Sequence, residues 1–231
     1  LVRIRVVQPE MYWFRMKMNF RKFWMGSTIY KRSLLLAFIM AYFCTPVFAQ
    51  NSIFDQLRST FEAGKVFKAD FTHTYIDSYT EEETKTNGTI WINKDGYRLE
   101  ADDQIIVVDG ALSTVYDAAR NRVIISEYDA EEDDFAPSRL LSGLDETYVL
   151  AGEESSGGIT TINLESNDDF AVFVGISIEV GSDLHPQKIT ATDFAENVII
   201  TGFSNGEFLS DAEGIFELSP PEDAEIVDMR Y

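Results

Sequence analysis

The stretch F-K-A-D-F-T-H-T-Y at residues 67–75 decides the fold, because apolar and polar residues alternate along it. Such alternation is typical of a β-strand with one buried face. The same period recurs after an acidic spacer in G-T-I-W-I at residues 88–92, in Y-R-L-E at residues 97–100 and in I-I-V-V at residues 105–108. The pairs Asn87-Gly88, Asp95-Gly96 and Asp109-Gly110 separate these runs as turn signals. The sequence therefore predicts consecutive antiparallel hairpins with one apolar, aromatic face.

Composition and charge narrow the possible partners. The 231 residues are 45% hydrophobic, which is enough for a sizeable core. Residues 1–49 hold 8 of the 19 basic and 1 of the 39 acidic residues, so residues 50–231 carry 11 basic and 38 acidic ones, a net charge of −27. A body this acidic repels phosphate backbones and anionic headgroups, which excludes nucleic-acid binding. Its heavy carboxylation also fits a saline habitat.

The N-terminal 49 residues have the pattern of a targeting segment. A basic region begins at Met25, an apolar run follows, and small residues end at Ala49. We expect residues 1–24 to be translated upstream sequence, residues 25–49 to be a cleaved signal peptide and residues 50–231 to be one domain. The alternative is an uncleaved membrane anchor. Cys44, the one cysteine, falls inside this segment, so the exported protein should have no disulfide.

Two short helices are expected among the strands. Ser52 is a plausible N-cap for a helix with the apolar stripe Ile53, Phe54, Leu57 and Phe61, which Gly64 ends. This helix either packs onto the sheet as core or covers a binding surface. A second helix at residues 137–143 presents Leu140, Leu141 and Leu144 on one side and could fold over the sheet as a lid. Further strands are predicted at residues 122–128, 148–151, 158–165, 170–180, 188–193, 198–204 and 215–218.

No catalytic or metal-binding motif is recognisable. His73 and His185 are far apart, and His73 shares the apolar face of its strand, as a hydrogen-bonded, half-buried residue does. The acidic clusters at residues 81–83, 102–103 and 131–134 lack the spacing of a calcium loop. We therefore expect no active site, no metal and no cofactor.

Large apolar residues are more numerous on the strand faces than two short helices can cover. Either the sheet closes and fills its own interior, or it curves into a cup that holds something hydrophobic. Periodicity alone leaves both alternatives open. The candidate cavity residues are Phe67, Phe71, Tyr75, Ile90, Ile92, Tyr97, Leu99, Ile106, Val108, Phe173, Phe194 and Phe203.

The order of these features resembles the LolA family of periplasmic lipoprotein carriers across nearly all of residues 50–231. The matching features are F-x-A-x-F from Phe67, G-x-I-W-I from Gly88, the pair Tyr97-Arg98, I-V-V-D-G ending at Gly110, the mid-chain leucine helix, and a close with Pro220-Pro221. Two features depart from the family: Lys94-Asp95 stands where a basic residue and proline are common, and no aromatic residue follows Asp109-Gly110.

The resemblance implies a mainly β fold, an incomplete antiparallel barrel of about eleven strands, with short helices as a lid over an apolar cavity. It implies a monomer that receives lipoprotein acyl chains from an inner-membrane ABC transporter and passes them to an outer-membrane acceptor, without any chemical step. The lid residues would be Phe54, Leu57, Leu140, Leu141 and Leu144, and Lys94 or Arg98 would latch the lid. The alternatives are an exported lipid-binding or envelope-sensing protein on the same half-barrel, and a secreted β-rich enzyme such as a carboxylate hydrolase.

Overall fold

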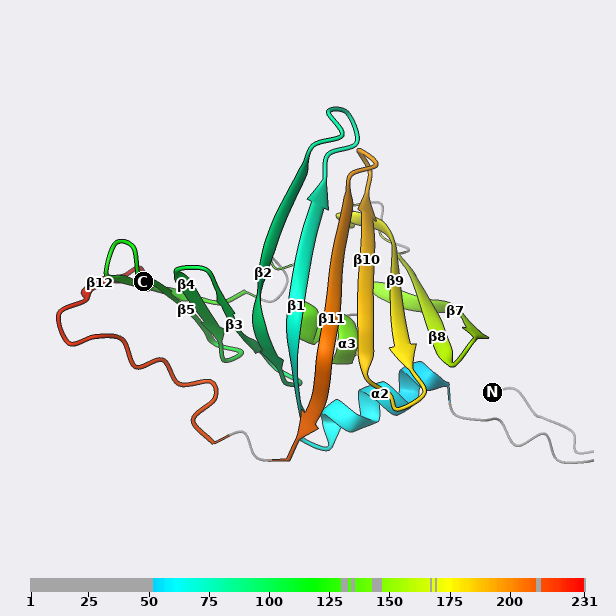
Figure 1. The fold of residues 1–231 in the computed structure, drawn as a ribbon, viewed down its shortest axis with the longest axis horizontal. Coiled ribbons are helices and arrows are strands. Elements are labelled where there is room, and N and C mark those ends of the chain that lie inside the picture. Colours follow the sequence, from blue (N-terminus) through cyan, green and yellow to red (C-terminus); the bar gives the residue numbers. More distant parts are fainter. Residues whose placement is uncertain are drawn as a thin grey trace, which may run out of the picture. The chain divides into compact units, whose positions relative to one another are not determined.

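The computed structural model describes residues 52–129, 133, 136–142, 147–166, 168, 170–210 and 213–230. The expected upstream segment, signal peptide and Cys44 lie outside these residues. The described residues belong to one compact unit, Gln50–Tyr231, which consists mainly of β-strands (Figure 1). In this part of the chain, no helix is long and apolar enough to cross a membrane.

Two helices and twelve strands make up the described residues. The helices are α2 (Ile53–Glu62) and α3 (Pro137–Ser142). The strands are β1 (Val66–Ile76), β2 (Glu83–Ile92), β3 (Tyr97–Ala101), β4 (Gln104–Val108), β5 (Leu112–Asp117), β6 (Arg122–Glu127), β7 (Tyr148–Ser156), β8 (Ile159–Ser166), β9 (Phe173–Gly181), β10 (Pro186–Asp193), β11 (Val198–Leu209) and β12 (Glu225–Asp228).

All twelve strands join one sheet in the order β12-β6-β5-β4-β3-β2-β1-β11-β10-β9-β8-β7. Consecutive strands form two meanders, β1 to β6 and β7 to β11, and the pair β1–β11 joins them at the centre. Every neighbouring pair is antiparallel except β12 and β6, which run parallel. The sheet is not closed, since β12 and β7 lie at its two edges. The predicted incomplete barrel is therefore confirmed, with one parallel strand added.

Helix α2 forms where its capping residues predict it. The Ser52 side-chain oxygen accepts a hydrogen bond from the backbone N–H of Asp55 at 2.9 Å, and Gly64 ends the helix with a φ of +79°. Its apolar stripe, Phe54, Leu57 and Phe61, is buried. The helix lies across the end of the sheet at which β2–β3 and β9–β10 turn (Figure 1).

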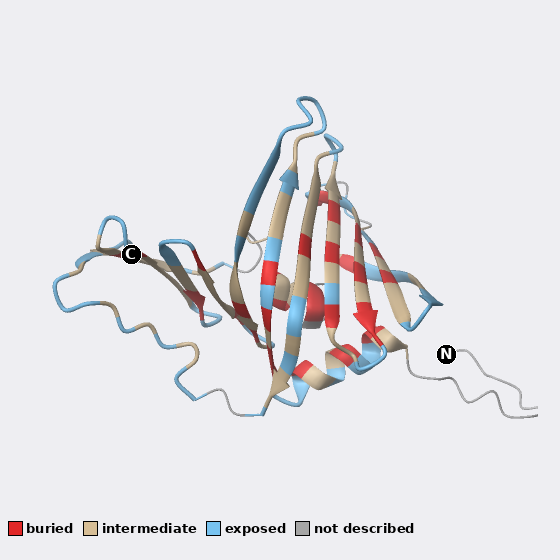
Figure 2. Cartoon of the chain, in the orientation of Figure 1, coloured by how far each residue is buried: buried red, intermediate tan, exposed pale blue. Residues whose placement is uncertain are grey.

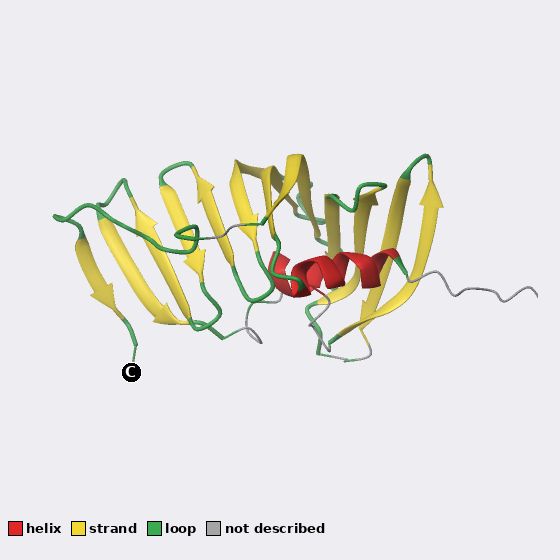
Figure 3. Cartoon of the chain, turned by 90° about the horizontal axis from the view of Figure 1, so that it is seen from below, coloured by secondary structure: helices red, strands yellow, loops and turns green. Residues whose placement is uncertain are grey.

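The core lies where the helices meet the concave face of the sheet. Both helices lie within the curve of the sheet (Figure 3), and buried residues concentrate on α2, α3, β1 and β8 to β10 (Figure 2). Cross-strand rows supply the sheet side, for example Ile162, Ile178 and Ile189, which lie opposite one another on β8, β9 and β10. The half of the sheet formed by β3 to β6 and β12 has far fewer buried residues.

Two local predictions are wrong. Asn87-Gly88 is not a hairpin turn but lies inside β2, and the turn falls instead between β1 and β2 at residues 77–82. A Cβ on Gly88 would stand 2.0 Å from the Glu100 carbonyl oxygen and 2.9 Å from the Phe71 ring. Glycine is therefore needed here because the neighbouring groups leave no room for a side chain. Residues 215–218 form a turn and extended chain rather than a strand, and the chain pairs only later, as β12.

Candidate lipid-binding site

A cavity of about 750 Å³ lies against the concave face of β1 to β5. Strand register builds its apolar wall, because residues opposite one another on neighbouring strands share a face. One such row runs from Ile90 on β2 through Leu99 on β3 to Ile106 on β4. Phe71 and Tyr97 complete the apolar wall. The apolar part of the cavity wall is therefore formed by large side chains on β1 to β4.

Polar groups line the neighbouring part of the same sheet face. His73 on β1 lies opposite Thr201 on β11, and its Nδ1 is 2.9 Å from the Thr201 hydroxyl. Burial lowers the pKa of His73 below its ordinary value of 6.5, so the ring is neutral at neutral pH. Thr86 and Gln104 also border the cavity. The predicted half-buried, hydrogen-bonded role of His73 matches this geometry.

The turns β3–β4 and β5–β6 bring charged groups to one end of the cavity. Asp102 and Asp103 come from the first turn, and Arg120 comes from the second. Arg120 Nη1 donates to Asp117 Oδ2 at 2.6 Å, and this hydrogen bond holds the pKa of the Asp117 carboxyl below its usual value. Since the residues on these turns are exposed, this end of the cavity opens to solvent.

Asp133 anchors the roof of the cavity at the entry to α3. Its Oδ2 accepts hydrogen bonds from the hydroxyls of Tyr97 at 3.0 Å and Tyr128 at 3.1 Å. Its backbone oxygen accepts from Arg139 Nη1 at 3.1 Å. Burial and the nearby Asp133 charge raise the pKa of both tyrosines, so both hydroxyls stay protonated as donors. The segment before α3 is thus tied to the sheet, because the neutral hydroxyls of Tyr97 and Tyr128 donate to the Asp133 carboxylate.

The structure divides the twelve predicted cavity residues between cavity and core. Phe71, Ile90, Tyr97, Leu99 and Ile106 line the cavity. The others lie elsewhere: Phe67, Ile92, Val108 and Phe173 are buried, Phe203 packs edge-on against Phe67, Tyr75 is 36% exposed and Phe194 is 66% exposed.

The placement of Phe194 in the cavity is wrong. The register between β9 and β10 shifts between Thr192 and Asp193, and β10 ends at Asp193. Phe194 therefore follows in the turn between β10 and β11 and does not continue the strand alternation. A register shift of this kind leaves no periodic signal in the sequence.

The predicted lid helices pack as one layer. Phe54 and Leu57 of α2 and Leu140 and Leu141 of α3 are buried in the same hydrophobic cluster as the sheet residues. Helix α2 contacts both α3 and β8. The predicted lid residue Leu144 lies outside the described residues.

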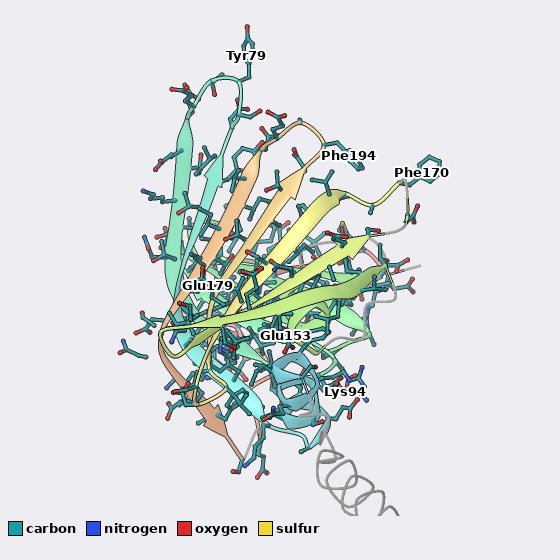
Figure 4. All side chains as sticks on the ribbon, turned by 90° about the vertical axis from the view of Figure 1, so that its right-hand side faces the viewer. Tyr79, Lys94, Glu153, Phe170, Glu179 and Phe194 are labelled. Atoms are coloured by element: carbon teal, nitrogen blue, oxygen red, sulfur yellow. The ribbon has the colours of Figure 1, made fainter. Side chains whose placement is uncertain are left out.

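A residue that the sequence did not reveal fixes the start of α2. The carboxylate of Glu153 on β7 accepts hydrogen bonds from the backbone N–H groups of Ile53 at 3.0 Å and Phe54 at 2.7 Å. These are donors of the first helical turn, where a negative charge also meets the positive end of the helix dipole. Figure 4 shows Glu153 at the strand edge beside the helix. Because a register shift between Leu150 and Gly152 interrupts β7, alternation could not place Glu153.

Neither predicted latch residue holds the lid. Lys94 is exposed in the β2–β3 turn and forms no ion pair with any residue that the structure describes. Arg98 faces the convex side of the sheet, where its guanidinium lies 5.8 Å from the Trp91 ring centroid. Its Nη1 donates to the backbone oxygens of Ile215 at 3.0 Å and Glu217 at 3.1 Å. Arg98 therefore holds the C-terminal segment. Because successive residues of a strand point to opposite faces, Arg98 must face the convex side when Tyr97 and Leu99 face the concave side.

Among the residues that the structure describes, no group of three or more His, Cys, Asp or Glu side chains could hold a metal ion.

The fold and the site together define an open half-barrel protein with a partly apolar cavity against the concave face of its sheet. The family model for the outer membrane lipoprotein carrier protein LolA matches residues 62–215, about two thirds of the chain. The protein belongs to the LolA family.

Several solved structures are similar to this chain at low sequence identity. An uncharacterized conserved protein from Thermus thermophilus is 14% identical with a TM-score of 0.50, covering 76% of this chain and 96% of that chain. A putative outer membrane lipoprotein-sorting protein domain from Vibrio parahaemolyticus is 11% identical with a TM-score of 0.40, covering 71% and 93%. A LolA superfamily protein from Nitrosomonas europaea is 11% identical with a TM-score of 0.38, covering 70% and 97%. No curated protein sequence matches.

Proposed function

We propose that this protein is a periplasmic carrier that binds the acyl chains of lipoproteins released from the inner membrane and delivers them to the outer membrane. The observation that carries the proposal is the apolar wall of the cavity, formed by Phe71, Ile90, Tyr97, Leu99 and Ile106. In this role the protein acts as a monomer and makes or breaks no bond. An inner-membrane ABC transporter supplies the cargo, and an outer-membrane acceptor receives it.

The energetics of acyl-chain binding fit a cavity of this kind. Each methylene group moved out of water contributes about 0.8 kcal/mol. A dozen buried methylenes therefore contribute roughly 10 kcal/mol before the cost of opening the lid is subtracted. Delivery requires that the closed state be only moderately favoured, since the same contacts must be released at the acceptor. A roof held by a few hydrogen bonds at Asp133 fits that requirement.

A charge placed in the cavity wall tests the proposal. Leu99→Glu puts a carboxylate on the concave face, and Thr114→Glu puts one on the convex face of β5 as a matched control. We expect Leu99→Glu to abolish binding of a fluorescent triacylated lipopeptide, because a buried charge opposes acyl chains. Thr114→Glu should bind as the wild type does, and both variants should keep the circular dichroism of a β-protein. Normal binding by folded Leu99→Glu would contradict the cavity assignment.

Native mass spectrometry of protein purified from its own host identifies the cargo. A monomer that carries an acylated protein or peptide is the expected result. A monomer with a free lipid would instead make the protein a carrier of another amphiphile, the alternative that the same cavity allows. A clean mass that takes up no lipopeptide would contradict both.

A further inference from the structure

Three aromatic side chains project into solvent from one end of the sheet. Tyr79 in the β1–β2 turn and Phe170 in the β8–β9 turn are each 92% exposed, and Phe194 in the β10–β11 turn is 66% exposed. Figure 4 shows all three pointing away from the same end, opposite the end at which α2 lies. We call these three residues the aromatic rim. Large aromatic residues so exposed leave apolar area in water that a partner can cover.

Hydrogen bonds join the two turns that carry Tyr79 and Phe194. The backbone N–H of Ser78 donates to Asn197 Oδ1 at 3.0 Å, and the Ser78 hydroxyl donates to the Ala195 oxygen at 2.5 Å. Tyr79 and Phe194 are each next in sequence to one of these bonded residues. The two aromatic residues therefore stand on turns that are fixed to each other.

An aspartate also accepts a backbone hydrogen bond next to or near each of the three aromatic residues. Asp77 Oδ1 accepts from the Thr80 backbone N–H at 2.7 Å, and Asp193 Oδ1 accepts from that of Ala195 at 2.8 Å. Asp168 Oδ1 accepts from the Phe170 N–H at 2.9 Å. The backbone that carries Tyr79 and Phe194 is therefore already ordered before binding, which lowers the entropy cost of using these two residues as a binding surface.

Exposed carboxylates lie on the two turns that carry Tyr79 and Phe194. Glu81, Glu82 and Glu83 follow Tyr79 and are exposed, and Glu196 is exposed beside Phe194. Lys85 is paired with Glu83 at 2.9 Å. Residues 50–231 as a whole carry a net charge of −27. An anionic membrane and a second copy of this acidic rim are both repelled, whereas a basic surface is attracted.

We propose that the aromatic rim docks a partner protein whose contacting face carries lysine or arginine residues around an apolar pocket. The aromatic side chains fill the pocket and the surrounding carboxylates pair with the basic residues, which is the usual division between the core and the edge of an interface. This docking surface does not include any residue that lines the cavity. It is therefore independent of what the cavity binds.

Site-specific photo-crosslinking in the producing cells identifies the partner. p-Benzoylphenylalanine replaces Tyr79 or Phe194 in the full-length chain, and it replaces Ile226 as the control. Ile226 lies on the β12 edge strand and is 64% exposed, so it matches Phe194 in exposure but not in position. The expected result is one protein crosslinked from positions 79 and 194 but not from 226, with the crosslinked peptide rich in lysine or arginine.

Binding of the purified pair then decides the proposal. The double variant Tyr79→Ser/Phe194→Ser should bind this partner at least about tenfold more weakly, and Ile226→Ser should bind it unchanged. Rising salt should weaken wild-type binding. Lipopeptide binding by the double variant should stay at the wild-type level, which separates this test from that of the carrier function.

Four results would overturn the proposal. These are crosslinks to lipid, crosslinks to a second copy of the chain, no crosslink above the Ile226 control, and wild-type affinity of the double variant.

Discussion

His73 is an ionisable ring in the cavity wall, next to the apolar part of that wall. Its Nδ1 lies 2.9 Å from the Thr201 hydroxyl in that wall. Burial lowers its pKa, so the folded state accepts a proton less readily than the unfolded chain does. When the unfolded state binds more protons, stability rises with pH. His73 therefore does not lower the free energy of unfolding at pH values above its ordinary pKa of 6.5. It lowers that free energy increasingly as the pH falls below this value.

We predict that His73→Asn makes stability less sensitive to mild acid. Between about pH 7.5 and about pH 5.5, the free energy of unfolding should fall more for the wild type than for the variant. Urea denaturation at a series of pH values measures this difference, and the carboxylates common to both proteins cancel from it. Above about pH 7.5 the two curves should run parallel. A steeper loss in the variant would contradict the assigned direction of the pKa shift.

At the level of single residues, alternation predicted the concave face correctly wherever a strand is regular. Phe71, Ile90, Tyr97, Leu99 and Ile106 lie on regular strands and line the cavity. Alternation could not separate cavity from core, because that depends on where the helices pack: Phe67 and Ile92 lie on the same face but belong to the core. A register shift hid the position of Glu153, whereas Phe194 falls just beyond the strand that was predicted at residues 188–193.

Helix α2 is attached to the sheet in two different ways. Its apolar stripe packs into the core, and its first turn donates two hydrogen bonds to Glu153 on β7. β7 lies at the edge of the sheet and pairs with β8 alone. The Glu153 contact therefore connects the start of α2 to an edge strand rather than to the centre of the sheet.

We predict that Glu153→Ala lowers the free energy of unfolding by about 1–2 kcal/mol, because two helical N–H groups lose their acceptor. Glu153→Gln keeps an acceptor oxygen and should lose less. Denaturant unfolding measures the stability, and hydrogen exchange at Ile53 and Phe54 should quicken. Glu154→Ala, an exposed neighbour in the same strand, is the matched control and should change neither. Equal exchange rates in Glu153→Ala and wild type would show that the contact does not hold the helix.

At the level of elements, strong local signals predicted most of the fold. The capping residues Ser52 and Gly64 predicted α2, and Pro137 predicted the start of α3. β12 was missed because it has only four residues and pairs in parallel with β6, which is distant in sequence. Such a pairing has no hairpin turn that could predict it. The expected strand at residues 215–218 does not form, since Arg98 holds the backbone oxygens of Ile215 and Glu217 in a segment that joins no strand.

The whole domain carries a charge that opposes its own compactness. Residues 50–231 hold 38 acidic and 11 basic side chains, and the described ion pairs are mostly exposed. Exposed pairs contribute little to stability, so they do not offset the repulsion among the remaining carboxylates.

We predict that the melting temperature rises when NaCl is increased from about 0.02 M to about 0.5 M, because salt screens this repulsion. Differential scanning calorimetry of the domain measures the change. An equal rise with KCl would identify screening rather than binding of a particular cation. A melting temperature that falls with either salt would contradict the prediction.

The central pair of strands also determines the order in which the chain can fold. Phe71 on β1 lies opposite Phe203 on β11, so the middle of the sheet joins the first and nearly the last parts of the domain. The two meanders need only neighbouring strands and can assemble quickly, whereas contacts between distant parts of a chain form slowly. During synthesis the N-terminal part of the domain appears first. The edge of β1 that pairs with β11 therefore stays unpaired until β11 has been made. The protein is therefore expected to be a slow folder whose halves remain separable until the end of the chain arrives.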